Sequence, residues 1–297
     1  MSKENYIYKN KENQTKLLGF YDKAISKWPV VYENFMIKTR YGDTHVIASG
    51  PKDVSNPSIV LIHAAGINAT VWSSNINAFS QLYRVYALDT IGDLGKSILK
   101  NKNYYPKSAQ DYSIWLDDVL DGLGVTQAYV IGSSMGGWIA HGAAIFYPCS
   151  ERIKKIVLID PAAGIPEKTK WSSLFFIAAI LPFKWNHKRI ANKILGKTNE
   201  KKEFWINYMV TAFDSKVKPK LGLPSKFSDE ELKKTKVPTL LLIGQEEVIY
   251  NNINKTIERA KKFISGICII IIPNAGHLPN IDQPEMVNKH ILKFLNQ

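Results

Sequence analysis

Apolar runs alternate along most of the chain with longer segments in which apolar residues recur at helical spacing. Runs rich in Val, Ile and Leu, with few polar interruptions, are typical of strands buried on both faces of a parallel sheet. Such runs occupy residues 58–62, 84–88, 129–131, 153–159, 238–243 and 267–272. Helical spacing predicts helices over residues 71–82, 108–123, 138–146, 252–264 and 283–295. The alternation predicts an α/β fold, a mostly parallel sheet covered by helices on both faces.

The alternation stops after Asp160 and resumes at Val237. No strand-like run occurs between these points. We therefore expect a helical cap at residues 161–236, inserted into a core that comprises residues 1–160 and 237–297. Helix-like stretches in the predicted cap cover residues 172–181, 187–195 and 201–213. Its aromatic residues could line an apolar pocket, although for any one of them a place in the cap's own core is favoured. They include Trp171, Phe175, Phe176, Trp185, Phe204, Trp205 and Tyr208.

The N-terminal residues carry no sign of a targeting segment. Residues 1–16 lack an apolar stretch, so we do not expect them to act as a signal peptide. Residues 11–28 have the spacing of an amphipathic helix. Residues 33–39 and 44–48 predict an antiparallel hairpin at the start of the sheet.

The strongest chemical motif is Gly132-Ser133-Ser134-Met135-Gly136-Gly137, between a predicted strand and a predicted helix. It contains the G-x-S-x-G pattern centred on Ser134. Glycines two residues on either side leave room where a Cβ would collide with the neighbouring strand and helix. The helix start also supplies backbone N–H groups for a developing negative charge. The alternative is a small-residue turn without chemistry.

A serine nucleophile needs a base, and His277 is the best placed of the six histidines. It follows the last buried strand. His45, His141, His187 and His290 suit structural roles better, and the small residues after His63 suggest backbone chemistry in that loop. A base histidine needs an acid to fix its tautomer. Glu247 and Glu246 follow one strand and Asp160 follows another, so all three are candidates. Because ligand crevices lie at the carboxyl ends of parallel strands, the fold brings these loops to one edge.

Composition narrows the remaining possibilities. The chain has 297 residues and a net charge of +13, and residues 161–236 hold 16 Lys and Arg against 7 Asp and Glu. The lysines are interspersed with apolar residues, so a solvated basic face is favoured and no nucleic-acid partner is expected. Attachment of residues 184–236 to anionic membranes is the minority hypothesis. Cys149 and Cys268 are expected to be free thiols in a cytoplasmic protein. The longest apolar stretch, residues 174–183, is too short to span a bilayer.

From about residue 30 to the end, the chain resembles the α/β-hydrolase family. The resemblance rests on motifs in the order that this fold uses. They are the loop after His63, the Asp89…Gly92…Gly95-Lys96-Ser97 loop, the Gly132–Gly137 motif, the acid loop after Ile243, and Gly276-His277. Together they are specific for the fold and less specific for the reaction.

The resemblance implies that Ser134 is the nucleophile and that His277 acts as base and then as acid. It implies an oxyanion hole formed by the backbone N–H groups of Met135 and of a residue in the 63–66 loop, which we place at Ala65. Many members carry Gly-x-x-Asp in the acid loop. Here the third residue after Gly244 is Glu247, which we prefer as the acid over Asp160 and Glu246 because this offset fits.

A second departure concerns the oxyanion loop, where many members have His-Gly and this chain has His63-Ala64. Alanine disfavours a positive φ, so the loop must differ slightly or tolerate that conformation. The departure bears on the identity of the donor more than on the presence of an oxyanion hole.

The predicted function is serine hydrolysis of a small to medium carboxylic ester, without a metal or other cofactor. The same catalytic residues also serve thioesterases, amidases, carbon–carbon bond hydrolases and acyltransferases, and these alternatives stay open. So does a non-catalytic, ligand-binding member of the fold. A serine at position 134 disfavours dehalogenases and epoxide hydrolases, which use an aspartate nucleophile on this fold. The natural substrate and the oligomeric state are not encoded in these motifs.

Overall fold

The computed structural model describes residues 6–53, 55–166, 168–170, 183–196 and 200–297. Within these ranges one sheet of nine strands runs through the molecule. The strands are β1 (Tyr32–Thr39), β2 (Gly42–Ser49), β3 (Ser58–Ile62), β4 (Val85–Leu88), β5 (Ile98–Leu99), β6 (Ala128–Ser133), β7 (Ile153–Ile159), β8 (Thr239–Gly244) and β9 (Cys268–Ile272). Their order is β1-β2-β4-β3-β6-β7-β8-β9, and the short β5 pairs with β2. β1 and β2 form the predicted antiparallel hairpin, and all strands from β4 to β9 along this order are parallel.

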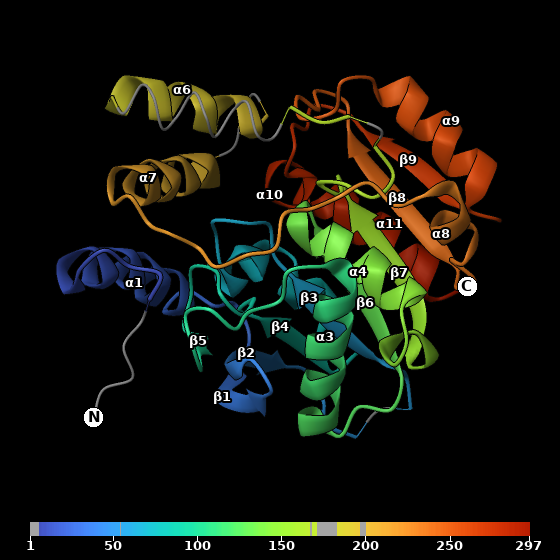
Figure 1. Ribbon diagram of the computed structural model, residues 1–297, viewed down its shortest axis with the longest axis horizontal. Helices are drawn as coiled ribbons and strands as arrows, with labels where there is room; N and C mark the ends of the chain where they lie inside the picture. The colour runs from blue at the N-terminus through green and yellow to red at the C-terminus, as the bar shows by residue number, and fades with distance from the viewer. Residues whose placement is uncertain (1–5, 54, 167, 171–182, 197–199) are drawn as a thin grey trace.

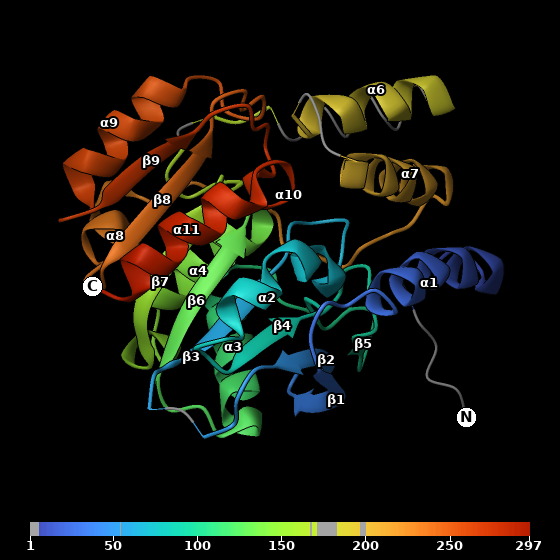
Figure 2. The same ribbon diagram turned by 180° about the vertical axis from the view of Figure 1, so that it is seen from behind.

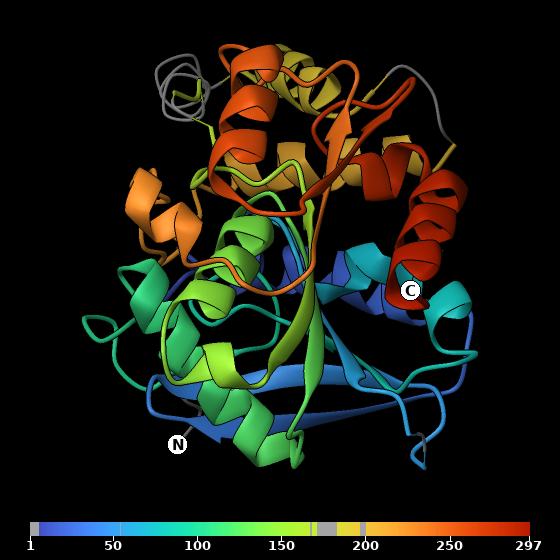
Figure 3. The ribbon, with the colours of Figure 1, turned by 90° about the vertical axis from the view of Figure 1, so that its right-hand side faces the viewer.

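Helices cover both faces of the sheet. They are α1 (Lys11–Ile25), α2 (Ile76–Phe79), α3 (Ala109–Leu123), α4 (Met135–Ile145), α6 (Lys184–Ile194), α7 (Glu200–Asp214), α8 (Asp229–Lys233), α9 (Ile253–Phe263), α10 (Pro279–Asp282) and α11 (Pro284–Leu295), with short 3-10 helices η1 (Ala69–Ser74) and η2 (Cys149–Glu151). Figure 1 shows α3 and α4 in front of the sheet, and Figure 2 shows α2 and α11 on the opposite face. The edge-on view in Figure 3 shows the sheet between these two layers. The predicted fold class is confirmed.

Local sequence signals explain why several helices begin and end where they do. The side chain of Ser108 accepts a hydrogen bond from the N–H of Asp111, whose carboxylate accepts one from the N–H of Ser108. This capping box starts α3, and Gly124 ends it in the left-handed conformation. The same reciprocal cap between Ser228 and Glu231 starts α8.

The predicted helix over residues 71–82 is wrong. The chain there forms η1 and then α2, separated by Asn75. The side chain of Asn75 is fully buried and donates a hydrogen bond to Asn288 in α11 at 2.8 Å. Asparagine is a poor residue for a helix interior, and here a tertiary hydrogen bond fixes it at the break. The short elements β5, η2 and α10 have no counterpart in the predicted pattern.

The described part of the segment between β7 and β8 contains the helices α6, α7 and α8. Helix α7 packs against α6 on one side and α1 on the other, and Figure 1 shows these three helices stacked along one side of the molecule. Phe20 of α1 contacts Phe204 and Tyr208 of α7, with ring centroids 5.6 and 5.7 Å apart. The N-terminal helix therefore supports the inserted helices, in addition to its contact with η1.

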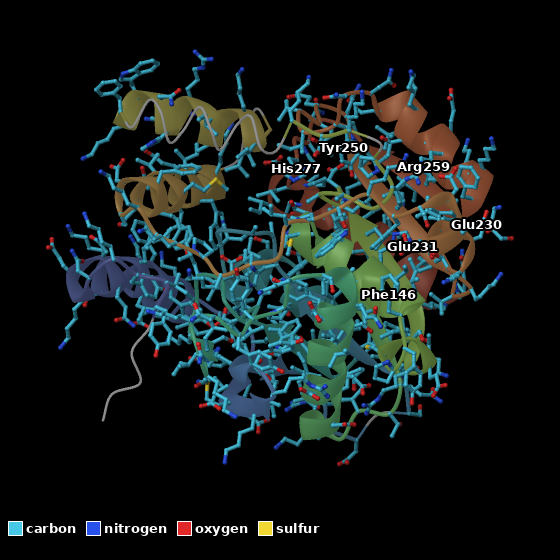
Figure 4. All side chains as sticks on the ribbon, in the orientation of Figure 1. Phe146, Glu230, Glu231, Tyr250, Arg259 and His277 are labelled. Carbon is cyan, nitrogen blue, oxygen red and sulfur yellow. The ribbon has the colours of Figure 1, made fainter. Side chains whose placement is uncertain are left out.

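The two ends of this segment are tied to the core by Arg259 of α9. Its guanidinium donates hydrogen bonds to the carbonyl oxygens of Gly164, Ile165 and Phe227 and to the carboxylate of Asp229. Figure 4 shows Arg259 next to α8, where Glu230 and Glu231 also lie. The insertion is thus anchored where it leaves the core and where it returns.

Candidate active site

Ser134 lies at the sharp turn between β6 and α4. Its φ of 52° is in the left-handed region that residues with a side chain rarely adopt. A Cβ at Gly132 would lie 2.0 Å from the carbonyl oxygen of Gly136, and a Cβ at Gly136 would lie 2.1 Å from the carbonyl oxygen of Ile62. These distances show why both positions are glycine, since backbone atoms cannot move aside cheaply. The predicted strained turn is present.

Neighbouring strands and loops hold the backbone of this turn. The N–H of Ser134 donates to the carbonyl oxygen of Ile159 at 2.8 Å, and its own carbonyl oxygen accepts from the N–H of Ala162 at 2.9 Å. The hydroxyl of Ser133 donates to Asn280 in α10 at 3.2 Å. Ser133 therefore helps to fix the turn and does not face the same partner as Ser134.

Three side chains from three loops form one hydrogen-bonded row. Nε2 of His277 lies 2.7 Å from Oγ of Ser134, and Nδ1 of His277 lies 2.5 Å from Oε2 of Glu247. Oε1 of Glu247 accepts hydrogen bonds from the backbone N–H groups of Ile249 and Tyr250. All three side chains are almost completely buried. Figure 4 labels His277 and Tyr250 in the loops at the strand ends. This row can take a proton from a serine hydroxyl and hold the resulting imidazolium.

Two buried carboxyl groups lie close together beside this row. Asp160 does not contact His277 through a hydrogen bond; its Oδ2 accepts from the N–H of Gly244 at 2.8 Å. Burial raises the pKa of Asp160 well above its usual range, and the charge of Glu247 raises it further. Burial also raises the pKa of Glu247, but the adjacent His277 and its hydrogen bonds outweigh that effect and lower it overall. The two carboxyl groups are thus driven apart in protonation, which is typical of paired acids.

The backbone donors expected for an oxyanion hole belong to Met135, which follows Ser134, and to Ala65 in the loop after β3. Within the described part of the chain, the N–H groups of Met135 and Ala65 have no hydrogen-bond acceptor. The N–H of Gly66, in contrast, is taken by both carboxylate oxygens of Asp93, at 3.1 and 3.0 Å. Gly66, and not Ala64, has the positive φ, of 76°. The loop therefore accommodates Ala64 without strain and leaves Ala65 available as a donor.

Two buried residues that the sequence reasoning did not assign hold this loop in place. His63 donates from Nδ1 to the carbonyl oxygen of Ala64 at 2.8 Å and accepts at Nε2 from the N–H of Thr90 at 2.9 Å, which fixes its neutral tautomer. Burial lowers the pKa of His63 in keeping with this form. Burial also raises the pKa of Asp93 to about 7. The position of Asp93 within the Gly92–Gly95 loop was the signal that could have identified it.

Asp89 and two of the other histidines have structural partners. Asp89 accepts hydrogen bonds from the N–H groups of Ala69 and Lys96 and contacts Nδ1 of His45 at 3.0 Å. His141 contacts the hydroxyl of Thr235 at 2.9 Å. These contacts agree with the structural roles expected for both histidines.

The end of α6 and the residues that follow it contact the loop that carries His277. The N–H of His277 donates to the carbonyl oxygen of Ile194 at the end of α6, at 2.8 Å. Oδ2 of Asp282 accepts from the N–H groups of both Gly196 and Gly276, at 2.7 and 2.8 Å. Ser134 has no exposed surface. Solvent therefore does not reach the Ser134 side chain in this structure.

The aromatic residues of the insertion divide into two groups. Trp205 and Tyr208 are buried, and the Tyr208 hydroxyl accepts a hydrogen bond from Asn68 after the oxyanion loop. Trp185, in contrast, is 61% exposed and stacks on Phe183. The expectation that Trp185 lines a pocket or a cap core is wrong, because the first turn of α6 points it to solvent. Three others, Trp171, Phe175 and Phe176, lie outside the described residues.

Asp160, Glu247 and His277 are the one group, among the described residues, with the composition and spacing of a metal site. Both ring nitrogens of His277 are already used by Ser134 and Glu247. A metal ion would have to displace one of these hydrogen bonds. Cys149 and Cys268 are free thiols, as predicted, and lie elsewhere.

Comparisons with known proteins agree on one family. The profile of the Alpha/beta hydrolase family matches residues 59–290. Two Bacillus subtilis proteins, the uncharacterized carboxylesterase nap and carboxylesterase YbfK, are each 35% identical to the chain; the alignments cover 96% and 93% of it and 94% and 92% of the relatives. The crystal structure of carboxylesterase CesB (YbfK) from Bacillus subtilis superposes with a TM-score of 0.85 at 33% identity, covering 96% of this chain and 98% of that one.

Proposed function

The chain belongs to the alpha/beta hydrolase family, and from that premise we propose that it is a carboxylesterase that works through an acyl-enzyme on Ser134. The observation that carries the mechanism is the hydrogen-bonded row of Ser134, His277 and Glu247. Similarity to carboxylesterases over nearly the whole chain supports the ester as the bond that is cleaved.

Acylation begins with the serine hydroxyl. Oγ of Ser134 attacks the ester carbonyl carbon while its proton passes to Nε2 of His277, 2.7 Å away. Glu247 accepts the Nδ1–H and stabilises the imidazolium. The carbonyl oxygen becomes an oxyanion, for which the N–H groups of Met135 and Ala65 are free to donate. Collapse of this intermediate breaks the bond to the alcohol oxygen, which takes the proton from His277.

Deacylation repeats these steps with water. His277 removes a proton from a water molecule as its oxygen attacks the acyl carbon, and the same N–H groups hold the second oxyanion. Collapse returns the proton to Oγ of Ser134 and releases the carboxylic acid. The cycle needs no metal or other cofactor.

The inserted segment sets the size of the substrate in this proposal. Residues 161–236 act as a cap, and the contacts of α1 with α7 add the N-terminal helix to its support. Because Ser134 and His277 are buried beneath it, the substrate is a small to medium ester that the cap can enclose. Large polymeric esters would require removal of the cap rather than its displacement.

We also propose a cytoplasmic location. No helix in the described ranges has the length and apolar character needed to cross a membrane. A minority hypothesis is that the basic residues of segment 184–236 attach the protein to the surface of anionic membranes. Sedimentation with vesicles tests this: binding that is the same with neutral and anionic lipid counts against it.

Hydrolysis of p-nitrophenyl butyrate by the purified protein tests the main proposal. We expect Ser134→Ala to abolish activity while the thermal midpoint stays near that of the wild type. Retention of full activity would show that another nucleophile acts. A fluorophosphonate probe should label the wild type and not the variant; no labelling of folded wild type would favour a ligand-binding protein. Product analysis with an alcohol or thiol acceptor separates hydrolysis from acyl transfer.

A further inference from the structure

Asp160 occupies an unusual place for a residue that does not contact His277. It is fully buried at the end of β7, with a positive φ of 40°. Its N–H donates to the carbonyl oxygen of Leu242 at 2.9 Å. The two residues that follow Asp160 contact the serine turn and the loop that carries Glu247. The N–H of Ala162 reaches the carbonyl oxygen of Ser134, and the carbonyl oxygen of Pro161 accepts the Tyr250 hydroxyl at 3.0 Å. Such a conformation persists only where the surrounding structure fixes it.

The two oxygens of Asp160 have different surroundings. Oδ2 accepts the N–H of Gly244, whereas Oδ1 is buried without a hydrogen-bond donor. A carboxyl oxygen of Asp160, one of Glu247 and a ring nitrogen of His277 all lie within 4.8 Å of one another. A second buried carboxyl group beside a carboxylate raises the free energy of the folded protein if it is charged. If it carries a proton, it can instead donate a hydrogen bond to the carboxylate.

The groups that face Asp160 do not compensate a negative charge there. Glu247 and Asp282 are themselves acids. The hydroxyl of Tyr250 donates its hydrogen bond to the carbonyl oxygen of Pro161, and His277 is already paired with Glu247. Two carboxylates at this spacing, away from water, do not both ionise. Glu247 is the one that ionises, since it has His277 and two backbone N–H groups as donors.

We propose that Asp160 is a positioning residue for the catalytic row: a neutral carboxylic acid whose Oδ1–H donates a hydrogen bond to the Glu247 carboxylate. Its Oδ2 then serves as the carbonyl that accepts the N–H of Gly244, so each oxygen has the partner that its chemistry requires. Glu247 retains a free lone pair for this bond, because His277, Ile249 and Tyr250 use only three of its four acceptor sites. The bond fixes the carboxylate that orients His277, so this inference rests on the proposed function.

Infrared difference spectroscopy tests the protonation state directly. The spectrum of the wild type minus that of Asp160→Asn, recorded on resting protein at neutral pH, should contain the carbonyl band of a neutral carboxylic acid, and the band should shift in D2O. Ser134→Ala is the matched control, since it removes activity and should leave the band in place. A difference spectrum with only carboxylate bands overturns the inference. Because this readout needs no substrate, it remains valid even if the proposed function fails.

Kinetics test the positioning role. Asparagine keeps both contacts, with its carbonyl toward Gly244 and its NH₂ toward Glu247, so Asp160→Asn should retain kcat and an unchanged acid limb of the kcat/KM profile. Asp160→Leu has similar volume and no donor, and should lower kcat by about ten- to a hundredfold with little change in KM. An ionised Asp160 would instead favour the imidazolium, so that Asp160→Asn would move the acid limb down by about one pH unit or more. That shift, or equal kcat values for the Leu and Asn variants with unchanged melting temperatures, overturns the inference.

Discussion

The variant Glu247→Gln tests whether Glu247 is the acid that orients His277, because the backbone around this position fixes the orientation of the new amide group. The N–H groups of Ile249 and Tyr250 both point at Oε1, so the amide oxygen of the glutamine is held at that position. The amide NH₂ then faces Nδ1 of His277. A ring nitrogen that faces a donor must be the acceptor, which places the imidazole proton on Nε2, toward Ser134. In that tautomer His277 cannot accept the serine proton.

The expected loss in kcat is about 10⁴-fold, the scale on which a wrong histidine tautomer acts in serine hydrolases. At 1.36 kcal/mol per factor of ten, this corresponds to about 5 kcal/mol of transition-state stabilisation. KM should change little, because Glu247 is separated from the substrate by His277. Initial rates with p-nitrophenyl butyrate give both values, and Glu246→Gln is the matched control, expected to stay within about twofold of the wild type. A loss below tenfold in Glu247→Gln, or a larger loss in Asp160→Asn, would refute the assignment.

Two further predictions concern substitutions of glycine by alanine and the buried carboxyl group of Asp93. Gly136→Ala should unfold or inactivate the protein, since its Cβ would lie 2.1 Å from the carbonyl oxygen of Ile62; Gly19→Ala in α1, where no atom lies within 4 Å, should raise the melting temperature slightly. Burial raises the pKa of Asp93 from 3.8 to about 7. The folded protein therefore binds more protons between these values, and the unfolding free energy should fall as pH rises across that interval, by at most about 4 kcal/mol. Urea titrations should show a steeper decline in the wild type than in Asp93→Asn, because the other buried carboxyl groups with a raised pKa, such as Asp160, contribute equally to both proteins; parallel curves would contradict the prediction.

Much of the fold could be predicted because it is encoded in short stretches. Six apolar runs became strands β3, β4 and β6–β9, and the hairpin β1–β2 formed where its polar turn indicated. The helix over residues 71–82 failed because a buried Asn75 interrupts it, and only its contact with Asn288, far along the chain, explains that residue. The three hydrogen-bonded side chains were also identified from sequence, since each follows a predicted strand.

What the sequence determined by itself was the α/β class, the strained serine turn and the set of loops that meet at the strand ends. Those features depend on residue spacing and on glycines at positions where a side chain would collide with the neighbouring backbone. Only the tertiary structure decided that Glu247, and not Asp160, contacts His277, since both acids follow strands that neighbour each other in the sheet. It also showed that His63 and Asp93 hold the loop after β3 and that the end of α6 accepts a hydrogen bond from the backbone of His277. These contacts join residues that are distant in sequence, so their geometry follows from the packing of the sheet and not from any local pattern.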